Sequence, residues 1–202
     1  MQNYKYFSII VIYILFLASC ATNTTIRAVA NQDQTLSYEN NFQWLTSIKE
    51  LYQVKIFPAK ELIEPYQPAE FGLWIYNNTN ENLNFSQENI RAYCGNQHIK
   101  VFTYEEALSD FKKRNEVSLA GLSPEQINSI AQRRLKTNYY ENRNQEYNQY
   151  ASILLKRQTI LSQTLYKGLF KIASPNPMCN NMIVIEVGDN IENHKFIFQL
   201  RH

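Results

Sequence analysis

Near its C-terminal end the chain contains two segments typical of β-strands, Met182-Ile-Val-Ile-Glu-Val187 and Lys195-Phe-Ile-Phe-Gln-Leu200. Phe196, Phe198 and Leu200 recur every two residues, which is the period of the side chains on one face of a strand. The connection between the two segments begins at Gly188, a residue that favours turns. We therefore expect the two segments to pair as a β-hairpin.

Further short strand-like runs precede this hairpin, and they are separated by Pro, Asn and Gly. They are Tyr52–Ile56, Phe71–Tyr76, Leu83–Phe85, Asn89–Cys94, His98–Phe102 and Leu165–Ile172. The pattern predicts a mainly β fold, an immunoglobulin-like β-sandwich of about seven strands. The likeness to immunoglobulin domains concerns the architecture alone, because Cys94 and Cys179 do not take the mid-strand positions of antibody domains.

The β pattern is interrupted by an expected helical insertion at about residues 104–160. Thr103-Tyr-Glu-Glu106 and Ser123-Pro-Glu-Gln126 have the form of capping boxes, in which the first and fourth side chains satisfy the free N–H groups of a helix start. Apolar residues then follow at helical spacing, and we expect them to pack on the sandwich or on a neighbouring helix. They are Tyr140, Tyr147, Tyr150, Ala151 and Leu154.

The N-terminal fifty residues are expected to lie outside the sandwich. Residues 21 to about 35 are rich in Ala, Thr, Asn and Gln, which is typical of a flexible tether. Trp44, Leu45 and Ile48 have the spacing of a short helix over Phe42–Leu51. The predicted organisation is a signal peptide at 1–19, a tether with a short helix at 20–50, and the sandwich at 51–202.

The signal peptide is indicated by Lys5 and by the twelve-residue apolar run from Phe7 to Ala18, which is shorter than the ~20 residues of a membrane-spanning helix. The run ends in Leu17-Ala-Ser-Cys20, which resembles the lipobox of bacterial lipoproteins. The resemblance implies that signal peptidase II cuts before Cys20 and that this residue carries the acyl chains. The alternative is a plain secretory signal with an incidental cysteine.

Three acyl chains on Cys20 would hold the protein on a bilayer permanently, since each buried methylene contributes roughly 0.8 kcal/mol. By the same resemblance, Ala21 at the following position favours the outer membrane, with the domain facing the periplasm. The mature chain would have 183 residues and a formal charge of +1.

Export changes the expectation for the other two cysteines. Cys94 and Cys179 form an even pair in an oxidising compartment, which favours a disulfide over two free buried thiols. Neither cysteine has a His or a second Cys at ligand spacing, so no metal site is expected.

Composition excludes several classes of function. Lys and Arg number 20 against 18 Asp and Glu, which argues against a nucleic-acid binder, and the five scattered glycines form no phosphate-binding loop. His98, His194 and His202 are the three histidines, and no catalytic motif accompanies them. We expect no enzyme and no cofactor.

The leading hypothesis is a non-enzymatic envelope lipoprotein that binds or scaffolds another envelope component. One alternative is a cell-wall or lipid hydrolase, which would have to gather His98, His194 and a carboxylate in a cleft. A second alternative is a surface-exposed lipoprotein that binds a ligand or acts as an adhesin.

Overall fold

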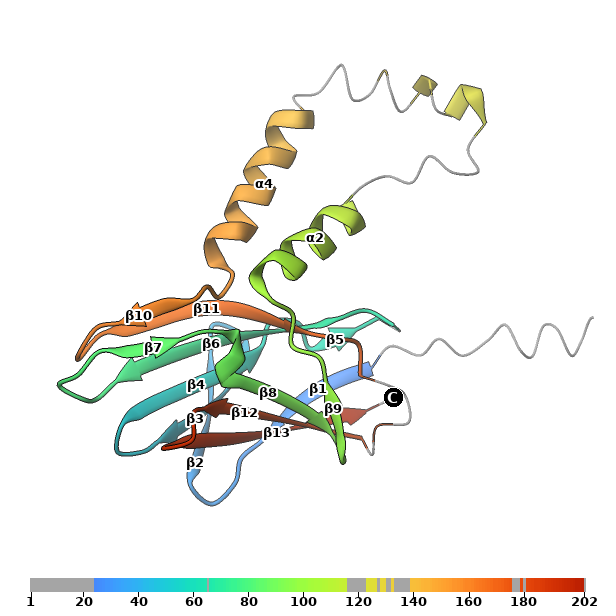
Figure 1. Cartoon of the computed structure of the whole chain (residues 1–202). Helices are drawn as coiled ribbons and strands as arrows, with labels where there is room; N and C mark the ends of the chain where they lie inside the picture. Colours follow the sequence, from blue (N-terminus) through green and yellow to red (C-terminus); the bar gives the residue numbers. More distant parts are fainter. Residues whose placement is uncertain are drawn as a thin grey trace, which may run out of the picture.

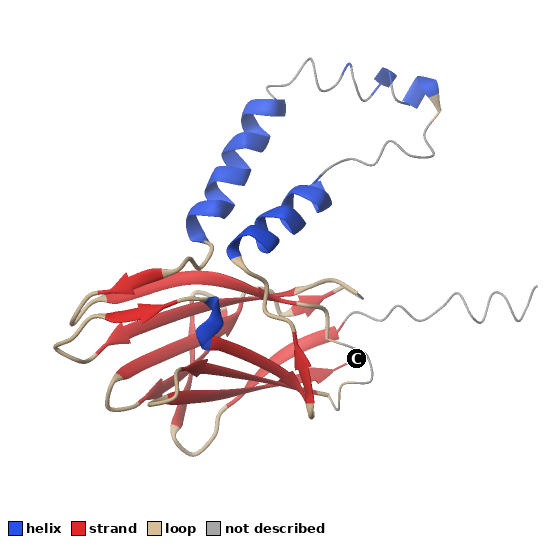
Figure 2. Cartoon of the chain, in the orientation of Figure 1, coloured by secondary structure: helices blue, strands red, loops and turns tan. Residues whose placement is uncertain are grey.

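The computed structural model describes residues 24–64, 66–115, 123–126, 128, 129, 132, 139–175, 179 and 181–201. Two antiparallel sheets pack face to face, and two helices stand on the outside of one of them (Figures 1 and 2). The β-sandwich predicted from the strand pattern is confirmed.

The six-stranded sheet has the order β5-β1-β13-β12-β8-β9 and the five-stranded sheet the order β11-β6-β4-β3-β2, while β10 and β7 form a separate pair. The strands of the described residues are β1 Thr24–Val29, β2 Gln34–Glu39, β3 Phe42–Ile48, β4 Tyr52–Pro58, β5 Leu62–Ile63, β6 Ala69–Asn77, β7 Leu83–Phe85, β8 Ile90–Cys94, β9 Gln97–Ile99, β10 Gln158–Ile160, β11 Leu165–Ile172, β12 Met182–Gly188 and β13 Asn193–Arg201. A 3-10 turn η1 spans Gln87–Asn89, and the helices are α2 Tyr104–Asn115 and α4 Tyr139–Ile153.

The core lies between the two sheets and contains side chains from every strand of the described residues except β2. The predicted hairpin is confirmed, since β12 and β13 pair antiparallel with Ile185 opposite Phe196. From the other sheet, Phe71 packs against Phe198 with ring centroids 5.0 Å apart and stacks on Phe170 at 5.6 Å. Burying each such side chain stabilises the fold by roughly 1.5–3 kcal/mol.

The helix expected over Phe42–Leu51 is wrong, because Phe42–Ile48 is strand β3. Asn40 and Asn41 before it have φ angles of 51° and 66°, the left-handed pair that a two-residue hairpin turn requires. This turn pairs β2 with β3. The spacing of apolar residues resembled a helix because Leu45 faces the core while Trp44 faces the opposite side of the sheet.

The tether expected over residues 20–50 is also wrong from Thr24 onward. Strand β1 lies between β13 and β5, with Thr25 opposite Arg201, and Ile26 is 1% exposed in the core. The sandwich therefore already includes Thr24–Val29 and does not begin at residue 51. With β1, β2, β3, β5 and β10, the described residues contain thirteen strands, more than the seven or so expected.

The helical insertion is confirmed, although it ends at Ile153 because Gln158–Ile160 is strand β10. Both capping boxes form: the N–H of Glu106 donates to Thr103 Oγ1 at 3.2 Å, and the N–H of Gln126 donates to Ser123 Oγ at 3.3 Å. In Figure 1 the two helices project away from the sandwich rather than lying flat on it.

Candidate functional site: the outer face of the five-stranded sheet

The outer faces of the two sheets differ in chemistry. On the six-stranded sheet the outward positions mix long polar side chains with apolar ones. The polar side chains are Arg27, Arg91, Glu186, Lys195 and Gln199, and the apolar ones form a cross-strand row of Val29, Ile197, Val184 and Tyr93. On the five-stranded sheet the equivalent positions hold aromatic rings and a buried group of charges, which makes this face the candidate site.

The aromatic residues form one cluster on the strands β3, β4 and β6, which we call the aromatic cluster: Phe42, Trp44, Phe57 and Trp74. The ring of Trp44 lies 4.1 Å from that of Phe57 and 4.6 Å from that of Trp74, centroid to centroid. Trp44 is buried, whereas the other three rings are half-buried and reach the surface. The cluster is therefore both rigid and accessible.

Two neighbours hold the aromatic cluster in place. Lys167 on β11 places its ammonium group 3.9 Å from the centroid of the Trp74 ring, a cation–π geometry. Gly72 on β6 leaves room for Phe57, because a methyl group at this position would overlap the Phe57 ring. The cluster thus depends on residues from several strands.

The helices α2 and α4 cover the part of this face that lies over β11 and β6. Ala107, Tyr150 and Leu154 form a small apolar core there, and the ring of Phe111 stacks on that of Tyr150 at 4.2 Å. This matches the prediction that Tyr150 and Leu154 pack on the sandwich or its neighbouring helices. Tyr147 is half-buried, and the side chain of Tyr140 lies outside the described part of the structure.

A network of charges fixes the helices to the sheet, and we call it the base cluster: Glu70, Asp110, Arg114, Tyr150 and Lys171. Lys171 is fully buried, and its Nζ lies 2.8 Å from Asp110 Oδ2 and 3.1 Å from Glu70 Oε1. Arg114 reaches Asp110 at 2.7 Å, and the Tyr150 hydroxyl donates to Glu70 at 2.9 Å. Burial and the neighbouring Glu70 raise the pKa of Tyr150, which stays a neutral donor. Two cations and two carboxylates balance, so the group can be buried.

The predicted histidines are not brought together. His194 on β13 and His98 on β9 belong to the same sheet with β12 and β8 between them, so three strand spacings alone separate them by about 14 Å. The register adds to this distance, because it places His98 level with Ile197 and not with His194. His98 is exposed and its ring makes a T-shaped contact with that of Tyr93, whereas His194 is fully buried. His202 lies outside the described residues. The cleft that the hydrolase alternative requires around His98 and His194 is not formed.

His194 does belong to a serine–histidine–carboxylate chain. Its Nδ1 lies 2.9 Å from Ser47 Oγ and its Nε2 lies 3.2 Å from Glu192 Oε1. Burial lowers the pKa of His194, and Glu192 only partly offsets this. Glu192 also accepts hydrogen bonds from the N–H groups of Leu51 and Tyr52. Ser47 belongs to β3 of the other sheet and is buried, so this hydrogen-bonded chain joins the two sheets. The Ser47 hydroxyl is not accessible to a substrate.

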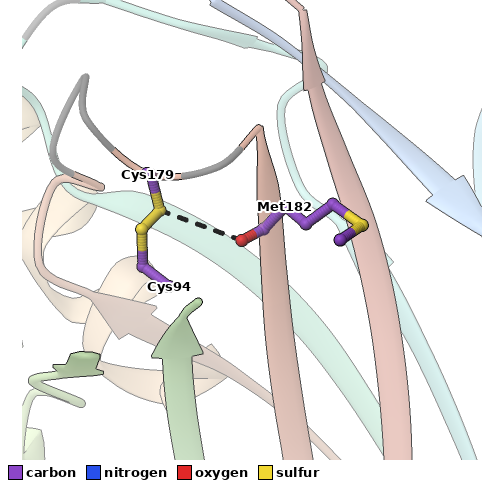
Figure 3. The surroundings of a disulfide bond; sticks show 3 residues. All are labelled: Cys94, Cys179 and Met182. Carbon is purple, nitrogen blue, oxygen red and sulfur yellow. Dashed lines mark hydrogen bonds between the residues drawn. A yellow bond between two sulfur atoms is a disulfide. The ribbon is translucent and has the colours of Figure 1, made fainter. Parts of the chain in front are cut away.

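The predicted disulfide between Cys94 and Cys179 is confirmed. It joins the end of β8 to the connection between β11 and β12, with Cα atoms 5.2 Å apart (Figure 3). Cys179 Sγ also lies 3.8 Å from the carbonyl oxygen of Met182. The bond ties a long connection to the edge of the six-stranded sheet.

The lipidation residue Cys20 lies outside the described residues. Among the helices of the described part, none has the length and apolar content needed to cross a bilayer. The described residues likewise contain no group of three or more His, Cys, Asp or Glu side chains arranged to hold a metal ion. Comparisons with protein-family models, curated proteins and solved structures return no match.

Neither the aromatic cluster nor the base cluster was predicted from the sequence, although the sequence contains a pattern that indicates each of them. Phe71-Gly-Leu-Trp-Ile-Tyr76 is apolar at odd and even positions alike, so each face of that strand carries a hydrophobic side chain. Lys171 interrupts the apolar run Leu169–Ile172, and a lysine inside such a strand needs a buried carboxylate partner.

Proposed function

We propose that this chain is a lipid-anchored, non-enzymatic protein of the bacterial envelope that binds another envelope protein through the outer face of its five-stranded sheet. Acylated Cys20 anchors it in the outer membrane, with the domain facing the periplasm. Leu17-Ala-Ser-Cys20 supports the anchor, and the Cys94–Cys179 bond fits an oxidising compartment.

The aromatic cluster carries the binding proposal. A sheet face that meets only water is normally polar at most of its outward positions. The aromatic cluster instead presents Phe42, Phe57 and Trp74 at the surface. Aromatic rings are enriched at the centre of protein interfaces, and Trp is among the residues that contribute most binding energy there.

The helices α2 and α4 complete the binding surface. The base cluster and the Phe111–Tyr150 stack hold them at a fixed angle, so their side chains are presented without a large ordering cost on binding. The exposed positions of α4 are mostly uncharged amides, which suit the polar rim of an interface. They include Asn144, Gln145, Asn148 and Gln149.

Photo-crosslinking in intact cells tests the surface. A photoreactive phenylalanine derivative replaces Trp74 on the aromatic cluster or Tyr147 on α4, and a matched control replaces the exposed Lys195 on the other sheet. We expect a discrete adduct with one envelope protein from positions 74 and 147 and none from 195. Adducts of equal yield from all three positions, or none from any under several growth conditions, would contradict the proposal.

The anchor is tested separately by Cys20→Ala. This variant should leave the membrane fraction and lose the acyl mass, while protease added to intact cells should spare the wild type if the domain faces the periplasm. Digestion of the wild type would instead favour the surface-exposed alternative.

A further inference from the structure

The sandwich starts close to the anchoring residue. Thr24 opens strand β1, so only residues 21–23 separate it from Cys20. Four residue steps span at most about 14 Å even when fully extended. If Cys20 is acylated, as the proposed function requires, the end of the sandwich at Thr24 is held within that distance of the lipid.

The structure identifies what else lies at this end. Thr24 pairs with Ile63 and Thr25 with Leu62 of the short edge strand β5, while Thr25 also lies opposite Arg201. Strand β5 belongs to the connection from β4 to β6, which we call the β5 loop and define as residues 59–64 and 66–68. Figure 1 shows β5 and the start of β1 on the same side of the molecule.

The β5 loop exposes two large side chains that the sandwich does not cover. Leu62 is 52% exposed and Tyr66 is 81% exposed. Tyr66 also has a φ of 62°, in the left-handed region that a bulky residue seldom occupies. A pocket of about 320 Å³ lies between this loop and Arg114 of α2, so the loop is not packed flat against the helix.

We propose that the β5 loop rests on the bilayer, with Leu62 and Tyr66 in the headgroup region. Tyrosine suits this depth because its ring is apolar and its hydroxyl can stay hydrated. Lys60 and Arg201, both exposed at this end, can meet lipid phosphates. Glu61 and Glu64 flank Leu62 and must remain in water, which limits the contact to the interface.

This contact would orient the domain. Strand β13 runs from Asn193 to Arg201 and is about 26 Å long at the usual rise per residue, so the turn before it lies far from the β5 loop. That turn contains Ile191, which is 82% exposed and provides a matched apolar control away from the lipid.

Fluorescence quenching in vesicles tests the contact on the full lipidated chain. Leu62→Cys, Tyr66→Cys and Ile191→Cys each add one free thiol, since Cys20 is acylated and the other cysteines are bonded. Each variant is labelled with an environment-sensitive dye and placed in vesicles of phosphatidylethanolamine and phosphatidylglycerol. Quenching by aqueous iodide should be at least about threefold weaker at 62 and 66 than at 191, and headgroup nitroxide lipid should quench only 62 and 66.

The outcomes separate this inference from the proposed function. Equal iodide quenching at all three positions, in protein that floats with the vesicles and carries acyl mass, would overturn the contact and leave the anchor intact. Shielding at 62 and 66 without nitroxide quenching would indicate a second copy of the chain instead of lipid and would also overturn it. A chain without acyl mass would overturn the anchor and the contact together.

Discussion

Replacing Lys171 with methionine tests whether the base cluster holds the helices on the sheet. Methionine keeps much of the length of the lysine stem but removes the ammonium group that lies 2.8 Å from Asp110 and 3.1 Å from Glu70. Arg114 contacts both carboxylates and can neutralise one charge, so one negative charge is left uncompensated. The side chains of Glu70 and Asp110 are only 16% and 24% exposed, so water screens that charge poorly.

Removing one partner of a buried ion pair lowers the free energy of unfolding by ~3–5 kcal/mol. Because the two carboxylates are partly exposed, we expect a loss of about 3 kcal/mol, at the lower end of that range. For a domain of this size that corresponds to a fall of about 6–12 °C in the melting temperature. Urea unfolding gives the free energy, and hydrogen exchange shows where protection is lost. We expect faster exchange in α2 and α4 before the strands of the core are affected.

Two further variants make the Lys171→Met result interpretable. Lys167→Met makes the same chemical change on the same strand and face, but Lys167 is exposed and loses only its contact with Trp74, worth about 0.5–1 kcal/mol. Adding Asp110→Asn to Lys171→Met removes the surplus charge and should recover at least about half of the loss. If Lys171→Met behaves like Lys167→Met and exchange in α2 is unchanged, the base cluster does not hold the helices.

Three further predictions concern stability. Removing the disulfide with Cys94→Ala and Cys179→Ala should lower the free energy of unfolding by about 2–4 kcal/mol, below the ~4.5 kcal/mol limit for a loop of this length, and non-reducing urea titration measures it. Burial lowers the pKa of His194 on folding, so its contribution to stability is fully present above the ordinary histidine pKa of ~6.5 and is lost as the pH falls through the folded pKa. Acid should therefore lower the urea midpoint of the wild type more than that of His194→Gln. Gly72→Ala should displace Phe57 at a cost of about 1–3 kcal/mol and change the tryptophan fluorescence, and an unchanged spectrum would count against the packing described.

Features that depend on nearby residues could be predicted from the sequence. Thr103 and Glu106 satisfy each other's backbone groups within one helical turn, so the start of α2 is encoded in four residues. The β12–β13 hairpin is similar, because its alternation and its turn lie within one short segment. The sandwich follows from the sum of such local patterns.

Strand β1 could not be found in the same way. Thr24–Val29 contains one strongly apolar residue that reaches the core, Ile26, and its two hydrogen-bonded neighbours are β13 and β5. Strand β13 lies more than 160 residues away along the chain, so the pairing that makes β1 a strand has no local signal. Because Thr24–Val29 form a strand of the sandwich, only three residues separate Cys20 from it.

The base cluster and the aromatic cluster together explain why β6 is apolar on both faces. Its inward side chains, Phe71 among them, pack in the core between the sheets, and this packing requires apolar residues on only one face of the strand. Trp74 on the outward face would be better replaced by a polar residue if water were its only neighbour, and Gly72 between them keeps Phe57 close to the sheet. The helices α2 and α4 cover the outer face over β11 and the start of β6 and leave Trp74 half-exposed. The inner face of β6 is therefore fully covered and its outer face is covered only in part, and the uncovered part is the surface on which the proposed binding to a partner rests.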